Sequence, residues 1–260
     1  MGKTKRVLVM VMTYPQPSLR YDEIVCTAGV LEDGSLVRLY PIDYRYRPYG
    51  SWYSKYQWIE AKLRRRHEDP RPESYRSVGD IVLREKIGTE DNWFERKRWV
   101  LRKGTSSMCD LMRRQQSEVS LGIVKPREIR DIKVEETSRE WSPKHIQHMN
   151  QINLFGETKK PLEKIPYSFK YRFLCEEDEY KGHIMTIIDW EVGVIYRRMR
   201  DKHEDEEVAR EKVREAFLER RCGPDMDVHF FVGTILRYNT WVVLGTFCPK
   251  KEHPRLPLWE

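Results

Sequence analysis

Two apolar runs separated by three residues place the strongest constraint on how this chain folds. Residues 23–31 and 35–40 flank Glu32-Asp33-Gly34. An Asp-Gly pair between two such runs is a strong hairpin signal, because glycine readily adopts the positive φ that a tight β-turn requires. Further strands are expected at residues 6–12, 56–63 and 79–87, with short helices near 92–101 and 107–116. The first part of the chain is therefore predicted to be β-rich, in the form of a small barrel.

The rest of the chain has a different pattern of elements. Residues 137–162 are polar and interrupted by Gly and Pro, which is typical of a linker. After it, two strands, two helices and two more strands are expected, at 168–175, 183–190, about 191–200, from Glu204 to Arg221, 228–233 and 240–247. The predicted fold class is α+β, with a basic β-rich domain at 1–136, a linker at 137–162 and a smaller α+β domain at 163–260.

Composition excludes several classes of protein. With 39% hydrophobic and 12% aromatic residues, the chain has enough apolar side chains for real cores, so wholesale disorder is excluded. The five cysteines are scattered and never form a CxxC pair, which argues against a secreted disulfide scaffold and favours a reducing cytoplasm. No run approaches the roughly 20 apolar residues that a membrane span needs. We expect a cytoplasmic protein with no membrane partner.

The net charge of +7 is unevenly distributed along the chain. Residues 1–150 hold 29 basic and 21 acidic residues, whereas residues 151–260 hold 19 and 20. The whole excess belongs to the first part. A localised basic surface attracts polyanions, and nucleic acid is the commonest such partner.

A stretch rich in aromatic and basic residues lies within this basic part. Eight of the nineteen residues from Tyr40 to Trp58 are aromatic. Aromatic rings stack on bases while cations follow the phosphates, so this combination suits single-stranded nucleic acid. Tyr and Trp also fill the cores of small β domains, which is the alternative interpretation. The candidate nucleic-acid-binding residues are Arg38, Tyr40, Arg45, Tyr46, Arg47, Trp52, Lys55, Arg64, Arg65 and Arg66.

A short motif in the predicted linker, Gln151-Ile152-Asn153-Leu154-Phe155, resembles the pentapeptide by which many bacterial DNA polymerases and repair proteins bind the sliding clamp. The matching residues are Gln151, Leu154 and Phe155. Such a motif combines an amide with two apolar anchors that fill a groove. The resemblance implies the DNA sliding clamp as a partner; in the alternative interpretation, Leu154 and Phe155 simply pin the linker to a domain.

Asp43, Glu60 and Lys62 form a first candidate set of catalytic residues. Their sequence context is similar to the core of the PD-(D/E)xK nuclease family, in which two carboxylates bind a divalent cation and a lysine helps to position water. The family's preceding helix and its carboxylate are not evident in this sequence. A surface ion pair between Glu60 and Lys62, which share one face of a strand, is the simpler interpretation.

Asp189 and Glu191 form a second candidate set, at a junction between a strand and a helix. They could hold Mg²⁺ or Mn²⁺. Capping of the helix by Asp189, with Glu191 in the first turn, is the favoured interpretation. His183 lies about 20 Å from Asp189 along an extended strand and cannot share its metal. Cys175 and His183 face each other across a predicted hairpin, but two ligands do not make a zinc site.

The chain as a whole resembles an uncharacterised prokaryotic family of two-part proteins. The signature comprises Thr13–Ser18, Val25–Gly29, Asp33-Gly34, Arg38–Pro41, His183–Glu191, Phe231–Thr234 and Leu244–Phe247. This resemblance implies a prokaryotic cytoplasmic protein and no particular chemistry.

Three functions are compatible with these patterns. We expect a nucleic-acid-binding protein of prokaryotic DNA or RNA metabolism or defence. The first alternative is a nuclease or other nucleic-acid-processing enzyme that depends on Mg²⁺ or Mn²⁺. The second is a protein-interaction subunit of a larger complex, which would have no affinity for nucleic acid on its own.

Overall fold

A computed structural model of the protein describes residues 2–115, 118–155, 162–176 and 182–252, with the backbone alone for 151–155. The described elements up to residue 114 are β1 (Lys3–Met12), β2 (Gln16–Ser18), β3 (Asp22–Leu31), β4 (Leu36–Ile42), the 3₁₀ helices η1 (Tyr44–Tyr46) and η2 (Tyr49–Ser51), β5 (Gln57–Arg65), β6 (Ser74–Lys86), α1 (Glu90–Val100) and α2 (Met108–Arg114). They are followed by β7 (Leu121–Val124), β8 (Glu128–Glu136), α3 (Pro143–Phe155), β9 (Tyr167–Leu174), β10 (His183–Thr186), α4 (Trp190–His203), α5 (Glu206–Arg214), the π-helical turn η3 (Glu215–Arg220), β11 (His229–Ile235) and β12 (Thr240–Phe247).

Five of the described strands close into a barrel. β1 pairs with β5 and β3, β5 with β6, β6 with β4, and β4 with β3, so the pairing returns to its starting strand. The pairing of β4 with β6 is parallel and the others are antiparallel. This strand order and these directions are those of an OB-fold, a five-stranded Greek-key barrel. The predicted β-rich first domain is confirmed.

The hairpin predicted at Asp33-Gly34 joins β3 to β4. Gly34 has a φ of +81°, and the Oδ1 atom of Asp33 accepts the backbone N–H of Ser35 at 2.8 Å. β1 is apolar on both faces because both are covered. Val7 and Val9 point into the barrel core, while Leu8 and Met10 pack in a second core shared with β7, β11 and β12.

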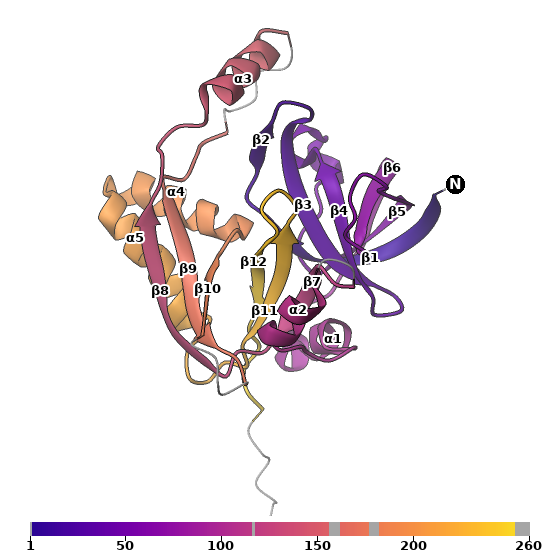
Figure 1. Ribbon diagram of the computed structural model, residues 1–260, viewed down its shortest axis with the longest axis vertical. Helices are drawn as coiled ribbons and strands as arrows, with labels where there is room; N and C mark the ends of the chain where they lie inside the picture. Colours follow the sequence, from indigo (N-terminus) through magenta and orange to yellow (C-terminus); the bar gives the residue numbers. More distant parts are fainter. Residues whose placement is uncertain (1, 116–117, 156–161, 177–181, 253–260) are drawn as a thin grey trace, which may run out of the picture.

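The second part of the chain forms two antiparallel sheets. β8, β9 and β10 make one, and β7, β11 and β12 make the other, which lies between the first sheet and the barrel (Figure 1). Helices α4 and α5 cover the β8–β10 sheet, and their side chains Tyr196, Ala209 and Val213 are fully buried in its core. This arrangement confirms the α+β fold class.

Strand pairing corrects the predicted domain boundary. β7 pairs with β11, and β8 pairs with β9, so residues 121–136 belong to the second domain although we expected them in the first. The expected linker, residues 137–162, contains α3 at one end of the molecule (Figure 1). In α3, the Nε2 atom of His148 lies 3.1 Å from Oδ1 of Asp22.

The second predicted helix also begins later than expected. Glu204 ends α4 in the left-handed conformation, with a φ of 53°, and Asp205 caps α5 by accepting the backbone N–H groups of Glu207 and Val208.

Among the described helices, none is both long and apolar enough to cross a membrane.

Candidate functional site between the two domains

A partly buried ionic cluster joins the first domain to the start of α4. Lys55 lies between η2 and β5, and its Nζ atom is 2.8 Å from Oδ1 and Oδ2 of Asp189 and 2.8 Å from Oε1 of Glu191. Arg221, just after η3, pairs with the other oxygen of Glu191 and donates to Oγ1 of Thr246 at 3.4 Å. We call Lys55, Asp189, Glu191 and Arg221 the Lys55 cluster.

Asp189 and Glu191 lie together at the start of α4. Oδ1 of Asp189 accepts the backbone N–H of Glu191 at 3.0 Å, so Asp189 caps α4 as expected. The structure also brings the two carboxylates together, as the metal hypothesis requires. The cation on which they converge is the ammonium of Lys55, which we had assigned to nucleic-acid binding.

Burial and charge shift the pKa values in this cluster in different directions. Burial raises the pKa of Asp189, whose side chain is 0% exposed, although Lys55 opposes the shift. Burial also acts on Glu191, but the charges of Lys55 and Arg221 outweigh it and lower the pKa of Glu191 to about 2. Burial would lower the pKa of Lys55, yet the two carboxylates raise it. The shifts of Lys55 and Glu191 favour their charged forms, whereas burial favours the neutral form of Asp189.

A pocket of about 510 Å³ opens beside the cluster and takes side chains from both domains. Five Lys and Arg side chains line the pocket, against a single carboxylate, that of Glu191. Arg96 packs against two rings, with its guanidinium carbon 4.1 Å from the ring centroid of Tyr56 and 5.0 Å from that of Trp93. We call this cavity the interdomain pocket. Its lining residues are Ser54, Lys55, Tyr56, Lys86, Trp93, Arg96, Glu191, Arg220, Arg221, Met226, Thr246 and Cys248.

Arg38 corrects one of our nucleic-acid predictions. It is 1% exposed, and its guanidinium donates to Oγ of Ser120 at 2.9 Å and to the carbonyl oxygen of Ser120 at 3.0 Å. Phosphate groups cannot reach it there. Arg38 instead fastens β4 to the residue that precedes β7.

The other predicted arginines have various structural partners. Arg45 lies 3.0 Å from Glu23, and Arg47 lies 2.9 Å from Asp43. Arg65 donates to the carbonyl oxygens of the loop between β5 and β6, and Arg64 is exposed. Arg66 lies over the ring of Tyr40, 5.1 Å from its centroid. Except for Arg64, these arginines therefore have contacts within the protein.

Burial divides the aromatic stretch into core residues and rings that reach solvent. Tyr44, Tyr53, Tyr56 and Trp58 are buried, as expected of core residues, and Tyr40 and Tyr46 are half-buried. Two rings reach solvent. Tyr49 is 84% exposed and Trp52 is 37% exposed, with ring centroids 5.5 Å apart.

The set of Asp43, Glu60 and Lys62 is not assembled into a metal site. β6 lies between β4, after which Asp43 follows, and β5, which carries Glu60 and Lys62. Asp43 pairs with Arg47, while Glu60 pairs with Arg84 at 2.7 Å. Each carboxylate thus has its own arginine.

The clamp-like motif lies at the end of α3. Helical backbone extends through residues 151–155. The side chains of Gln151, Leu154 and Phe155 lie outside the described residues, so the motif stays a prediction.

The fold and the pocket define a two-part α+β protein in which a β-barrel and a sheet-and-helix domain share a cationic cavity. The chain belongs to the family described as Domain of unknown function (DUF8757), whose model matches residues 103–258. Residues 3–102 match a second model, Domain of unknown function (DUF8758). The two models meet between residues 102 and 103. This boundary agrees with the expected two-part family, and it places β7 and β8 in the same domain as their partner strands β11 and β9. No curated protein matches the chain.

Proposed function

We propose that the protein binds nucleic acid at the interdomain pocket, in prokaryotic DNA or RNA metabolism or defence. The observation that carries the proposal is the lining of this pocket, in which five Lys and Arg side chains and two aromatic rings accompany a single carboxylate. Lys55 and Arg221 neutralise Asp189 and Glu191. Lys86 and Arg96 supply positive charge beyond that balance, while Arg220 pairs with Glu215 at the edge of the pocket.

The chemistry of this lining suits a nucleotide unit. Lys86 and Arg220 lie at exposed positions where they can approach phosphate groups without losing their solvation completely. Trp93 is half-buried, and its ring can stack on a base, which contributes about 1–3 kcal/mol per base. The OB-fold topology of the barrel supports the proposal by analogy, because OB-folds bind oligonucleotides and oligosaccharides.

Binding is tested with labelled single- and double-stranded DNA and RNA over a series of salt concentrations. We expect affinity that falls steeply with salt, because bound phosphates release counterions. Arg220→Ala should weaken binding and lower the slope of log affinity against log salt by about one. Arg98→Ala is a matched control, because Arg98 and Arg220 are both 65% exposed and both pair with a nearby glutamate, but Arg98 does not line the pocket.

If wild-type protein shows no affinity for any of the four nucleic acids at low salt, the proposal is overturned, because the pocket then does not bind nucleic acid. That outcome would favour the protein-interaction subunit.

Metal-dependent cleavage is a second candidate, favoured by the convergence of Asp189 and Glu191 on one ammonium. If Mg²⁺ or Mn²⁺ displaced Lys55, both carboxylates would already face the ion. The same labelled substrates, incubated with either ion, should then yield product that Glu191→Gln abolishes. Absence of product with both ions would exclude this candidate.

The DNA sliding clamp is proposed as a protein partner through Gln151, Leu154 and Phe155. Replacing Leu154 and Phe155 by alanine should abolish co-purification with the clamp, because the two apolar anchors are lost. Lys144→Ala, on the first turn of α3, serves as a control outside the motif. Undiminished association of the double variant would sink the motif hypothesis.

A further inference from the structure

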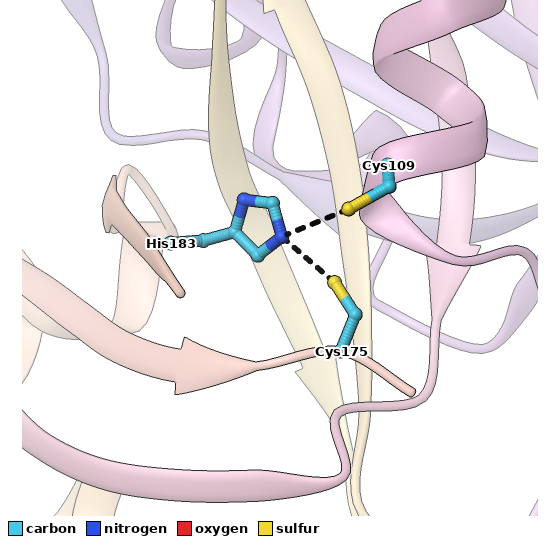
Figure 2. Close-up of side chains that lie close together, drawn as sticks. All are labelled: Cys109, Cys175 and His183. Atoms are coloured by element: carbon cyan, nitrogen blue, oxygen red, sulfur yellow. Dashed lines mark hydrogen bonds between the residues drawn. The ribbon is translucent and has the colours of Figure 1, made fainter. Parts of the chain in front are cut away.

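Two cysteines and one histidine from three places in the second domain meet at one point (Figure 2). Cys109 lies in the first turn of α2, Cys175 directly follows β9, and His183 begins β10. The Nε2 atom of His183 is 2.7 Å from Sγ of Cys175 and 3.8 Å from Sγ of Cys109. All three ligand atoms lie within 4.8 Å of one another. Among the described residues, no other group of three or more His, Cys, Asp or Glu side chains has this geometry.

The fold holds these groups in place from two directions. β9 and β10 pair in antiparallel register with Phe173 opposite His183, and the imidazole packs against the Phe173 ring at a centroid distance of 5.1 Å. On the other side, Met108 and Leu111 anchor α2 in the same hydrophobic core. The convergence of the three ligands therefore depends on the tertiary fold.

We propose that Cys109, Cys175 and His183 bind a zinc ion through two thiolates and one imidazole. Two thiolates with an imidazole are a typical zinc donor set. On a tetrahedral zinc ion a thiolate sulfur and an imidazole nitrogen stand roughly 3.6 Å apart, given metal–ligand distances of about 2.3 and 2.0 Å. The distance from Cys109 to His183 already matches. The distance from Cys175 to His183 must open by about 1 Å, which a small side-chain rotation provides.

Two other uses of these residues fit the structure less well. A Cys175–His183 nucleophilic pair would need access to substrate, but Cys175 is 3% exposed and His183 is 6% exposed. It would also leave the approach of Cys109 without a role. A disulfide between Cys109 and Cys175 would leave the imidazole without a role. Zinc uses all three groups at once.

Zinc at this position would fasten α2 to the end of the β8–β10 sheet. The three ligands lie within residues 103–258, and none of them lines the interdomain pocket. The zinc proposal is therefore independent of the proposed function. A tetrahedral ion takes four ligands, and the spectroscopic test below reports how many of them are sulfur.

The first test is the metal content of the full-length protein, measured by mass spectrometry after purification without chelators. We expect one zinc per chain. Replacing zinc by Co²⁺ should give thiolate-to-cobalt charge-transfer absorption and the visible bands of a tetrahedral ion, with an intensity that corresponds to two thiolates. Cys109→Ser, Cys175→Ser and His183→Gln should each lose the bound metal. Cys26→Ser, which alters a half-buried cysteine outside the group, should retain it.

Thiol counting separates zinc from a disulfide even if the ligand variants fail to fold. Wild-type protein denatured with a chelator should show five free thiols, one for each cysteine in the sequence. Three free thiols, with Cys109 and Cys175 identified as the linked pair by peptide mapping, would reveal a disulfide between them and overturn the proposal; the mapping is needed because Cys222 and Cys248 also lie side by side. Wild-type protein that neither contains zinc nor develops the cobalt spectrum would overturn it as well.

Discussion

The Nζ atom of Lys55 lies 2.8 Å from both carboxylate oxygens of Asp189, a residue 134 positions away in the chain. The Asp189 side chain is 0% exposed, so the ammonium replaces the water that would otherwise solvate this carboxylate. The same ammonium reaches Glu191, in the first turn of α4. A single lysine of the first domain thus contacts two acids of the second, and Arg221 supplies the second positive charge.

Removing this lysine should destabilise the protein strongly. Lys55→Met leaves Asp189 buried without its cation, and we expect a loss of about 3–5 kcal/mol in the free energy of unfolding. Urea denaturation measures it. Lys62→Met, at an exposed position of β5, should change stability by less than about 0.5 kcal/mol. The double variant Lys55→Met, Asp189→Leu should recover part of the loss, because no unpaired charge remains buried there. If Lys55→Met and Lys62→Met change stability equally, this account is contradicted.

Arg38 should behave as a structural residue. Arg38→Ala removes the hydrogen bonds that Arg38 donates to Oγ and the carbonyl oxygen of Ser120, although the carbonyl oxygen keeps the backbone N–H of Thr234, and we expect it to lower the free energy of unfolding by about 1–3 kcal/mol. The exposed Arg64 provides the comparison, since Arg64→Ala should leave the thermal unfolding temperature nearly unchanged. If both variants unfold at the wild-type temperature, the Arg38 contacts contribute little.

Local patterns in the sequence predicted local structure well. The hairpin at Gly34 and the capping of α4 by Asp189 depend on neighbours in the chain, and both are found. In contrast, Gly29 on β3 packs closely against Leu8 of β1, and this contact depends on a strand from an earlier part of the sequence. The barrel was nevertheless predictable in outline, because several short apolar strands with turn signals have few other ways to bury their apolar faces.

Contacts between distant residues explain what the sequence could not reveal. An arginine is normally placed at the surface, and the side chains that accept from the buried Arg38 come from distant parts of the sequence: Ser74, and Ser120 of the second domain. Cys175 and His183 are near neighbours in the chain, but Cys109 joins them only through the packing of α2. Strands β7 and β8 were assigned to the wrong domain because their partners come much later in the chain.

Gly29 should be nearly irreplaceable. A Cβ atom at this position of β3 would lie 2.2 Å from the carbonyl oxygen of Leu8 on β1, and a backbone atom cannot rotate out of the way. We expect Gly29→Ala to cost about 1–3 kcal/mol of stability or more, measured by chemical denaturation. Gly50→Ala is the control, since a Cβ at position 50 would meet nothing within 4 Å. A wild-type denaturation midpoint for Gly29→Ala would show that β1 and β3 can move apart without cost.

Asp69 should make the protein sensitive to acid. Its side chain is 0% exposed, and its oxygens accept from Nε of Arg71 at 2.9 Å and from a terminal nitrogen of the same guanidinium at 2.7 Å. Arg71 also donates to the carbonyl oxygen of Thr234 at 2.6 Å, so the pair links the barrel to β11. Burial opposes ionisation of Asp69, but the hydrogen bonds and charge of Arg71 outweigh it and lower the pKa of Asp69 to about 2.

This shift in pKa sets the direction of the pH dependence. Because the carboxyl group has a lower pKa in the folded protein than in the unfolded chain, the unfolded state takes up the proton first as the pH falls. The stabilisation is therefore complete above about pH 4, amounts to about 2 kcal/mol, and is lost as the pH falls toward 2. Asp69→Asn should be less stable than wild type at pH 7, and the difference should shrink between pH 4 and pH 2 in urea titrations. As a control, Asp80→Asn at an exposed position of β6 should follow the wild-type curve throughout. If the stability difference between Asp69→Asn and wild type stays constant at all these pH values, the charge of Asp69 does not contribute to stability.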